Sequence, residues 1–225
     1  MKLPSGLETR TYQNQGYFKV QVSARAVPVA EDAGEHYDVV IKVLEEGQQY
    51  RMADLRIINM TVFPEEQLRD LFPISRGEIF SKEQAAKGLE ELRRLYGSQG
   101  YLNFTAVPNT VIDDDDLSIG LEVDVDEGKQ FRLRSVEVLG VNPETKARVI
   151  NDLAMKPGDV YNSESWERSI EKFPNLVEEA DTVARKLDER GGWVDLVFDF
   201  RKTHPCPVNQ VVPPTVDLTA PASVH

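Results

Sequence analysis

The chain has 225 residues, of which 40% are apolar, and its 38 acidic against 26 basic side chains give a net charge of −12 at pH 7. Such an excess of negative charge repels nucleic-acid phosphates and anionic lipid headgroups, so the composition argues against a nucleic-acid-binding protein. The single cysteine, Cys206, excludes an intrachain disulfide and a cysteine-based metal site.

The first 48 residues predict an incomplete folding unit. Residues 12–17 have the pattern of a helix end, and apolar residues alternate with polar ones over 18–29 and 37–44, which indicates a β-hairpin. Residues 1–6 lack the apolar segment of a secretory signal. We therefore expect residues 1–48 to be the end of a truncated first module, and the chain to start at an internal methionine of a longer protein.

Residues 49–130 predict one complete module. A short strand pattern near Leu55 comes first, and Thr61 stands at the expected cap of a helix that ends near Phe72. A second helix begins at Ser81, which forms a capping box with Gln84. Two strands with a period of two then follow, on either side of the acidic turn 113–116.

Residues 131–204 repeat this order at an offset of 81 residues. Asn142 and Pro143 predict the start of the first helix of this copy, Pro174 should shorten its second helix, and residues 182–187 and 193–200 predict a hairpin. Residues 205–225 are rich in proline and predict an extended tail. The same offset relates two hexapeptides, Glu46-Gly47-Gln48-Gln49-Tyr50-Arg51 and Glu127-Gly128-Lys129-Gln130-Phe131-Arg132.

The element order β-α-α-β-β predicts an α+β fold made of tandem modules. In each module, a three-stranded mixed sheet would carry both amphipathic helices on one face and leave the other face in water.

This pattern resembles the POTRA (polypeptide-transport-associated) domain repeats of the bacterial outer-membrane β-barrel assembly protein family. The resemblance covers about residues 8–204 and rests on the element order, on the Gly-Tyr turn before the second strand at Gly100 and Tyr101, and on the repeated hexapeptide. It implies modules in the periplasm, associated with the outer membrane, that carry no catalytic residue, metal or cofactor. The implied partners are unfolded outer-membrane β-barrel proteins or accessory assembly proteins, next to a membrane β-barrel encoded in the same or a neighbouring chain.

Two groups of residues are candidates for a function. The edge strand of the complete module could bind a partner by β-strand addition, and it comprises Leu102, Asn103, Phe104, Thr105, Ala106 and Val107. The repeated hexapeptides could fix the angle between modules through ion pairs, and the residues concerned are Glu46, Gly47, Arg51, Glu127, Gly128 and Arg132. For the edge, an unused strand protected by twist and charge remains the alternative.

Other features are interpreted as structural. Gly16 and Gly100 predict positive φ angles, with the tyrosine after each packed on a helix end. The acidic turn 113–116 fails the calcium-loop template because Ser118 and Asp124 stand where glycine and glutamate belong, so it predicts a solvated tip. The three histidines lie apart, and no catalytic constellation can be built. Two other functions stay open: a two-partner secretion transporter, and a cell-surface adhesion or structural repeat protein.

Overall fold

The computed structural model describes residues 6–28, 37–171 and 182–201. Its elements, in chain order, are α1 (Gly6–Asn14), β1 (Gln21–Pro28), β2 (Tyr37–Glu45), β3 (Arg51–Ile58), α2 (Glu65–Arg69), α3 (Lys82–Ser98), β4 (Thr105–Asp113), β5 (Ser118–Asp126), β6 (Arg132–Leu139), α4 (Pro143–Asp152), α5 (Ser163–Glu171), β7 (Thr182–Asp188) and β8 (Trp193–Asp199). Pro174, Cys206, the three histidines and the predicted tail lie outside the described residues.

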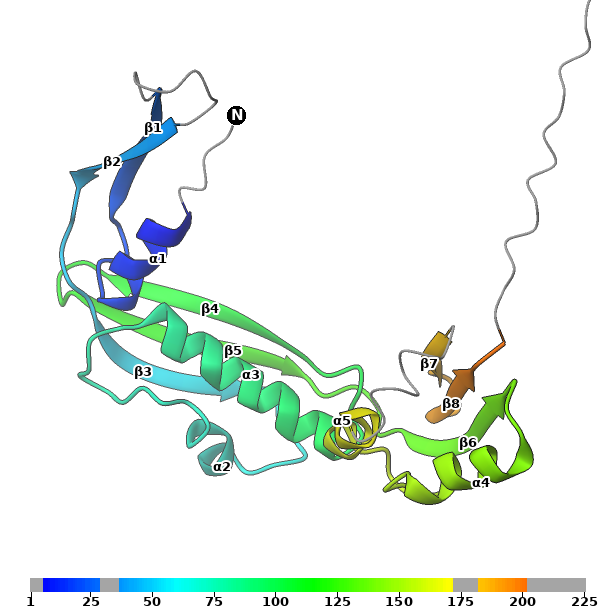
Figure 1. The fold of residues 1–225 in the computed structure, drawn as a ribbon. Coiled ribbons are helices and arrows are strands. Elements are labelled where there is room, and N and C mark those ends of the chain that lie inside the picture. The colour runs from blue at the N-terminus through cyan, green and yellow to red at the C-terminus, as the bar shows by residue number, and fades with distance from the viewer. Residues whose placement is uncertain (1–5, 29–36, 172–181, 202–225) are drawn as a thin grey trace, which may run out of the picture.

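The strands form two sheets of three strands and one hairpin (Figure 1). In the order β3-β5-β4, the central strand β5 is parallel to β3 and antiparallel to β4. The order β6-β8-β7 repeats this arrangement, and β1 pairs antiparallel with β2. The predicted α+β fold with three-stranded mixed sheets is confirmed.

Local sequence signals explain where two of the helices begin. The Ser81 side chain accepts a hydrogen bond from the backbone N–H of Gln84 at the start of α3, and Asn142 accepts one from Thr145 at the start of α4, with Pro143 next to it. Both predicted caps are confirmed. The prediction that Thr61 caps a helix is wrong, because α2 begins only after Pro64 and Thr61 binds a distant carboxylate described below.

Each three-stranded sheet buries one face under helices and loops. In the β3-β5-β4 sheet, β5 alternates between buried apolar residues and residues in contact with water, which is the pattern of a strand covered on one side. The helix α3 covers this side, and its Leu92 and Tyr96 are fully buried (Figure 1). A second core lies under the β6-β8-β7 sheet, and it includes Phe131, Leu133, Val149, Tyr161, Trp166 and Leu196.

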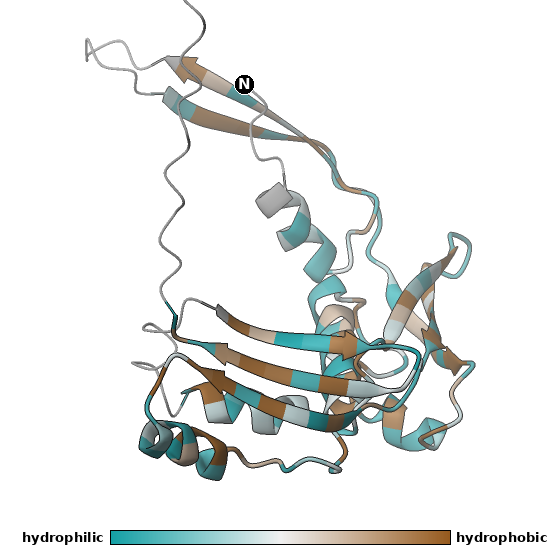
Figure 2. Cartoon of the chain, turned by 90° about the vertical axis from the view of Figure 1, so that its right-hand side faces the viewer, coloured by the Kyte–Doolittle hydropathy of each residue, from teal (hydrophilic) through white to brown (hydrophobic). Residues whose placement is uncertain are grey.

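The β1-β2 hairpin projects away from the two sheets (Figure 1), and its apolar residues remain in contact with water. Every residue of β2 is exposed, including Val39 and Leu44, and Figure 2 shows the apolar residues along the hairpin. The structure extends the predicted helix end at 12–17 to a helix of nine residues, α1, which contacts β1. By contrast, the corresponding central strand β5 buries Ile119 and Val123 completely.

Candidate functional site

The two edges of the β3-β5-β4 sheet differ in how far they are already occupied. Backbone hydrogen bonds join Met52 to Glu78 and to Gly77, and join Phe80 to Tyr50, so the segment 77–80 covers the first half of β3. Among the described residues, none pairs with β4 along its outer edge. The nine-residue strand β4 is therefore the longer free edge of this sheet.

The position of Pro108 shows which backbone groups of β4 face the free edge. Pro108 lies opposite Val123 in the ladder, and proline has no N–H to donate, so its backbone must point away from β5. In an antiparallel strand, the backbone N–H and C=O groups of successive residues point alternately toward the partner strand and away from it. The groups of Ala106, Thr110 and Ile112 therefore point away from β5, as those of Pro108 do. The free edge therefore offers N–H donors at these three residues and a gap at Pro108.

The side chains of β4 divide between the two faces of the sheet. Ala106 and Ile112 pack against the core under the helices. Val107 and Val111 lie on the open face, where they are 63% and 59% exposed. A strand added to this edge would thus meet two apolar side chains, four residues apart, on the face that is open to water.

The predicted edge strand begins too early. The residues Leu102, Asn103 and Phe104 form a turn, held by hydrogen bonds from the N–H of Leu102 to the Gly100 carbonyl and from the N–H of Phe104 to the Tyr101 carbonyl. The Phe104 ring stacks on Tyr96 at 4.1 Å and is buried, and Leu102 packs against the second core. Only Thr105, Ala106 and Val107 of the predicted segment belong to β4, which continues to Asp113.

A repeated backbone contact joins successive units. The N–H of Tyr50 donates to the Gly16 carbonyl at 2.9 Å, and the N–H of Phe131 donates to the Gly100 carbonyl at 2.8 Å. Beside them, the Gln49 side chain donates to the Gln15 carbonyl at 2.9 Å, and that of Gln130 donates to the Gln99 carbonyl at 3.0 Å. We call each set of two bonds a junction clamp, the first at Gly16 and the second at Gly100.

Both clamp glycines adopt the positive φ angles that the sequence predicts, +87° for Gly16 and +86° for Gly100. The tyrosine after each glycine packs edge-on against a helix tyrosine, as predicted. A Cβ atom at Gly100 would lie 2.8 Å from the Phe131 carbonyl oxygen, so the close approach of the two units also requires glycine.

The hexapeptide residues do not form the predicted ion pairs. Arg51 donates to the Gly77 carbonyl and Arg132 to the Gly158 carbonyl, which lie in the same unit as the arginine. Glu46 is exposed, and Glu127 binds within its own unit. Gly47 and Gly128 have positive φ angles and lie against the loops at Lys19 and Asn103. The glutamine and the aromatic residue, which sequence reasoning missed, make the contact between units.

Glu127 ties the end of β5 to the loop before α2. Its carboxylate accepts hydrogen bonds from the N–H of Thr61, from the N–H of Val62 and from the hydroxyl groups of Thr61 and Tyr96. Burial by itself would raise the pKa of the Glu127 carboxyl, but these donors outweigh it and lower the pKa to about 2. Burial, and then the bond to Glu127, raises the pKa of the Tyr96 phenol.

The first junction has polar contacts that the second one lacks. Asp114, in the acidic turn, accepts bonds from the Lys19 ammonium group and from the Tyr50 hydroxyl, both at 2.6 Å. The hydrogen bond from Lys19, followed by that from Tyr50, lowers the pKa of the Asp114 carboxyl. Asn103 and Phe131 stand at the corresponding places of the second junction. All four aspartates of the turn are exposed, as predicted for a solvated tip, and Asp114 in addition takes part in the first junction.

Replacement of Asp114 by asparagine is expected to loosen the first junction. Without the charge, Lys19 loses its ion-pair partner, and we expect the hairpin to sample a wider range of angles relative to the β3-β5-β4 sheet. Spin labels on Lys42 and Asn109, both exposed, would measure this as a broader distance distribution. Asp115→Asn is the matched control and should leave the distribution unchanged. Equal distributions in all three proteins would show that the Asp114 contacts do not restrain the hairpin.

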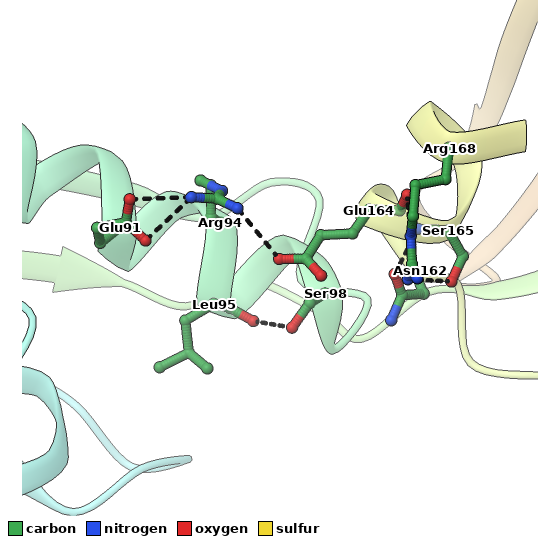
Figure 3. A network of polar contacts seen from close by, with 8 residues as sticks. All are labelled: Glu91, Arg94, Leu95, Ser98, Asn162, Glu164, Ser165 and Arg168. Atoms are coloured by element: carbon green, nitrogen blue, oxygen red, sulfur yellow. Dashed lines mark hydrogen bonds and ion pairs between the residues drawn. The ribbon is translucent and has the colours of Figure 1, made fainter. Parts of the chain in front are cut away.

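At the second junction, the C-terminal end of α3 lies beside the N-terminal end of α5 (Figure 3). Arg94 lies 3.7 Å from Glu164 and also pairs with Glu91 in its own helix. Beside this pair lies a cleft of about 210 Å³, lined by side chains of both charges and by two aromatic rings: Arg93, Arg94, Arg185, Glu90, Glu164, Glu167, Tyr101 and Phe104. The opposite charges neutralise one another, so the cleft favours neither anions nor cations.

The described residues contain no group of three or more histidine, cysteine, aspartate or glutamate side chains placed to hold a metal ion. No helix in this part of the chain is long and apolar enough to cross a membrane.

Comparison with known proteins supports the repeat architecture. The POTRA family model, described as surface antigen variable number repeat, matches residues 50–128. The outer membrane protein assembly factor BamA of Neisseria meningitidis is 22% identical over 175 residues, which cover 73% of this chain and 22% of BamA. The chain spans about a fifth of the length of the curated relatives it matches.

Two solved structures share the fold. The crystal structure of POTRA domains 3–5 of Haemophilus influenzae BamA superposes with a TM-score of 0.67 at 21% identity, and the match covers 86% of this chain and 76% of that one. Haemophilus ducreyi BamA lacking POTRA domains 1–3 gives a TM-score of 0.55 at 16% identity, over 67% of this chain and 29% of that one. Residues 50–128 thus match a POTRA domain, and the chain shares the fold of these solved POTRA structures.

Proposed function

We propose that this chain is the polypeptide-binding part of an outer-membrane protein assembly or transport system, located in the periplasm and associated with the outer membrane. Its partners are unfolded outer-membrane β-barrel proteins or accessory assembly proteins, next to a membrane β-barrel in the same or a neighbouring chain. Binding is non-covalent and involves no catalytic step. In this proposal, the chain consists of a partial unit at 1–48, a complete unit at 49–130, a variant unit at 131–204 and a tail at 205–225.

The observation that carries this proposal is the free edge of β4 in the unit that the POTRA family model matches. Each backbone hydrogen bond to an added strand contributes about 0.5–1.5 kcal/mol net, and Pro108 removes one donor from the middle of the edge. Few bonds of this strength give weak binding that depends little on the partner's sequence. Weak, sequence-tolerant binding suits a protein that holds many different unfolded chains for a short time.

The edge can be tested with Thr110→Pro. This change removes a second N–H from the free edge but keeps the ladder to β5, because the Thr110 N–H points away from β5. We expect about three- to tenfold weaker binding of a urea-unfolded outer-membrane β-barrel protein after dilution, which corresponds to the loss of one such bond. A photo-crosslinker at Val107, which is exposed, reports binding directly.

Thr110→Val is the matched control, because it changes the side chain and keeps the N–H group. It should bind like the unchanged protein. If Thr110→Pro is folded and also binds normally, β4 is not the binding edge. If no barrel protein crosslinks at Val107 above background, a structural or adhesion repeat becomes the better interpretation.

A further inference from the structure

Gly120 is the third residue of the central strand β5, on the face of the sheet opposite the helices. Its neighbours across the ladder are Val111 of β4 and the 53–54 bulge of β3. Glycine inside a strand lowers stability, because it has more conformational freedom to lose on folding and no side chain to pack. A glycine at this place therefore needs a reason.

Neither the backbone nor the packing supplies that reason. Gly120 is absent from the glycines of the described residues that have positive φ angles. A Cβ atom built on it would meet the Cβ atom and the carbonyl oxygen of Val111 at 3.8 Å and the Asp54 carbonyl oxygen at 4.0 Å, which is ordinary contact. At Gly88, by contrast, a Cβ atom would lie 2.2 Å from the Phe72 ring. The fold of this unit would accept a side chain at Gly120.

The β6-β8-β7 sheet shows that the same position can carry a side chain. Arg51 of β3 pairs with Ser118 of β5, and Arg132 of β6 pairs with Trp193 of β8, so Ser118 corresponds to Trp193. Gly120 comes two residues after Ser118 and therefore corresponds to Asp195 of β8. The Asp195 carboxylate accepts hydrogen bonds from Arg134 and Ser135, and these polar and charged groups line a hollow of about 370 Å³ there. The open face at Gly120 has no equivalent group above it.

Gly120 lies in a depression of about 240 Å³, whose lining is less charged than that of the hollow at Asp195. Val111 and Ala53 form apolar walls, and Val107 extends the apolar surface along β4. The polar residues at the rim and farther along this face are mostly acidic: Asp54, Asp113, Glu122, Asp124 and Asp126. Two of them are paired with arginines, Glu122 with Arg56 at 2.8 Å and Asp54 with Arg69 at 3.2 Å, and Asp113, Asp124 and Asp126 have no ion pair among the described residues. The surface thus combines an apolar hollow with a negative surround.

We propose that this hollow is a docking site for a protein partner that inserts one apolar or aromatic side chain over Gly120, flanked by lysine or arginine residues. The apolar side chain would be removed from water between Val111 and Ala53, and the basic residues would meet the acidic surround. The site goes beyond the proposed function and is separate from it, because a chain added to β4 extends the sheet sideways and this partner covers its open face. A side chain at Gly120 would extend into this hollow and take up part of the space.

The test uses the full chain and three synthetic peptides with blocked ends: Lys-Lys-Trp-Lys-Lys, Lys-Lys-Ala-Lys-Lys and Glu-Glu-Trp-Glu-Glu. Amide chemical shifts are followed during titration. The first peptide should shift the amides of Ala53, Val111 and Gly120, and it should bind at least about tenfold more tightly than the other two. Equal binding of the two lysine peptides would show charge attraction without an apolar site and would overturn the proposal.

Gly120→Val fills the hollow with a residue that favours strands. We expect its unfolding midpoint to equal or exceed that of the unchanged protein, while its affinity for the tryptophan peptide falls by about tenfold. Gly120→Ala should show an intermediate loss. Unchanged affinity in a folded Gly120→Val protein would overturn the site. Binding of an unfolded barrel protein at β4, measured in the same variant, should persist, so the two proposals can fail separately.

Discussion

Replacement of Gly100 by alanine is expected to lower the free energy of unfolding by more than about 3 kcal/mol. Alanine in the left-handed region, where Gly100 has a φ angle of +86°, costs about 1–2 kcal/mol. Its Cβ atom would also lie 2.8 Å from the Phe131 carbonyl oxygen and 3.1 Å from the Tyr161 carbonyl oxygen. These atoms belong to the backbone, so they can move only if the second junction opens.

The chain offers a matched control in Gly158→Ala. Gly158 has a φ angle of +97°, but a Cβ atom there would meet nothing within 4 Å, so the change costs only the backbone strain. Both tryptophans, Trp166 and Trp193, lie in the third unit, so denaturant unfolding followed by their fluorescence reports on that unit. Circular dichroism reports on the whole chain. Equal costs for the two substitutions would show that the close approach at Gly100 is unimportant.

Glu127→Gln is expected to destabilise the protein by about 1–3 kcal/mol near neutral pH. The folded pKa of Glu127, about 2, lies below its ordinary value of 4.5, so the folded state favours the charged form. The stabilisation is therefore fully present above about pH 4.5 and is lost as the pH falls toward 2. The difference between the two proteins should shrink over this range.

Glu122→Gln serves as the control for a carboxylate without such contacts. Its ion pair with Arg56 lies at the surface and should contribute less than about 1 kcal/mol. Tyr96→Phe removes one of the donors to Glu127 and should cost about 1 kcal/mol. Denaturant unfolding at several pH values measures all three. A Glu127→Gln difference that stays constant from neutral to acid pH would contradict the assigned role.

Features that depend on neighbouring residues could be predicted from the sequence. The caps at Ser81 and Asn142 and the positive φ of Gly100 each follow from a few adjacent residues, and the structure has all of them. Thr61 has the right type for a cap, but its hydroxyl group instead meets Glu127, 66 residues farther along the chain. A local pattern contains no information about that partner.

The start of β4 likewise could not be predicted from the local sequence pattern. The alternation of apolar residues from Leu102 onward is compatible with a strand, yet Phe104 is buried in the first core and Leu102 packs against the second. The sequence pattern records that these residues avoid water, but not which core they enter. For the junction, the repeated hexapeptide indicated the right place, while the two bonds of each clamp became visible only in three dimensions.

The junction clamp has a consequence for how such chains grow. One half of each clamp is a pair of backbone carbonyls at the end of a unit's second helix, and the other half is a backbone N–H and a glutamine side chain at the entrance of the next unit. A duplicated gene segment therefore brings both halves with it, and a new copy can join the array without first acquiring a matching surface. Arrays of different length can arise in this way, and their side chains can diverge while the joints keep their form.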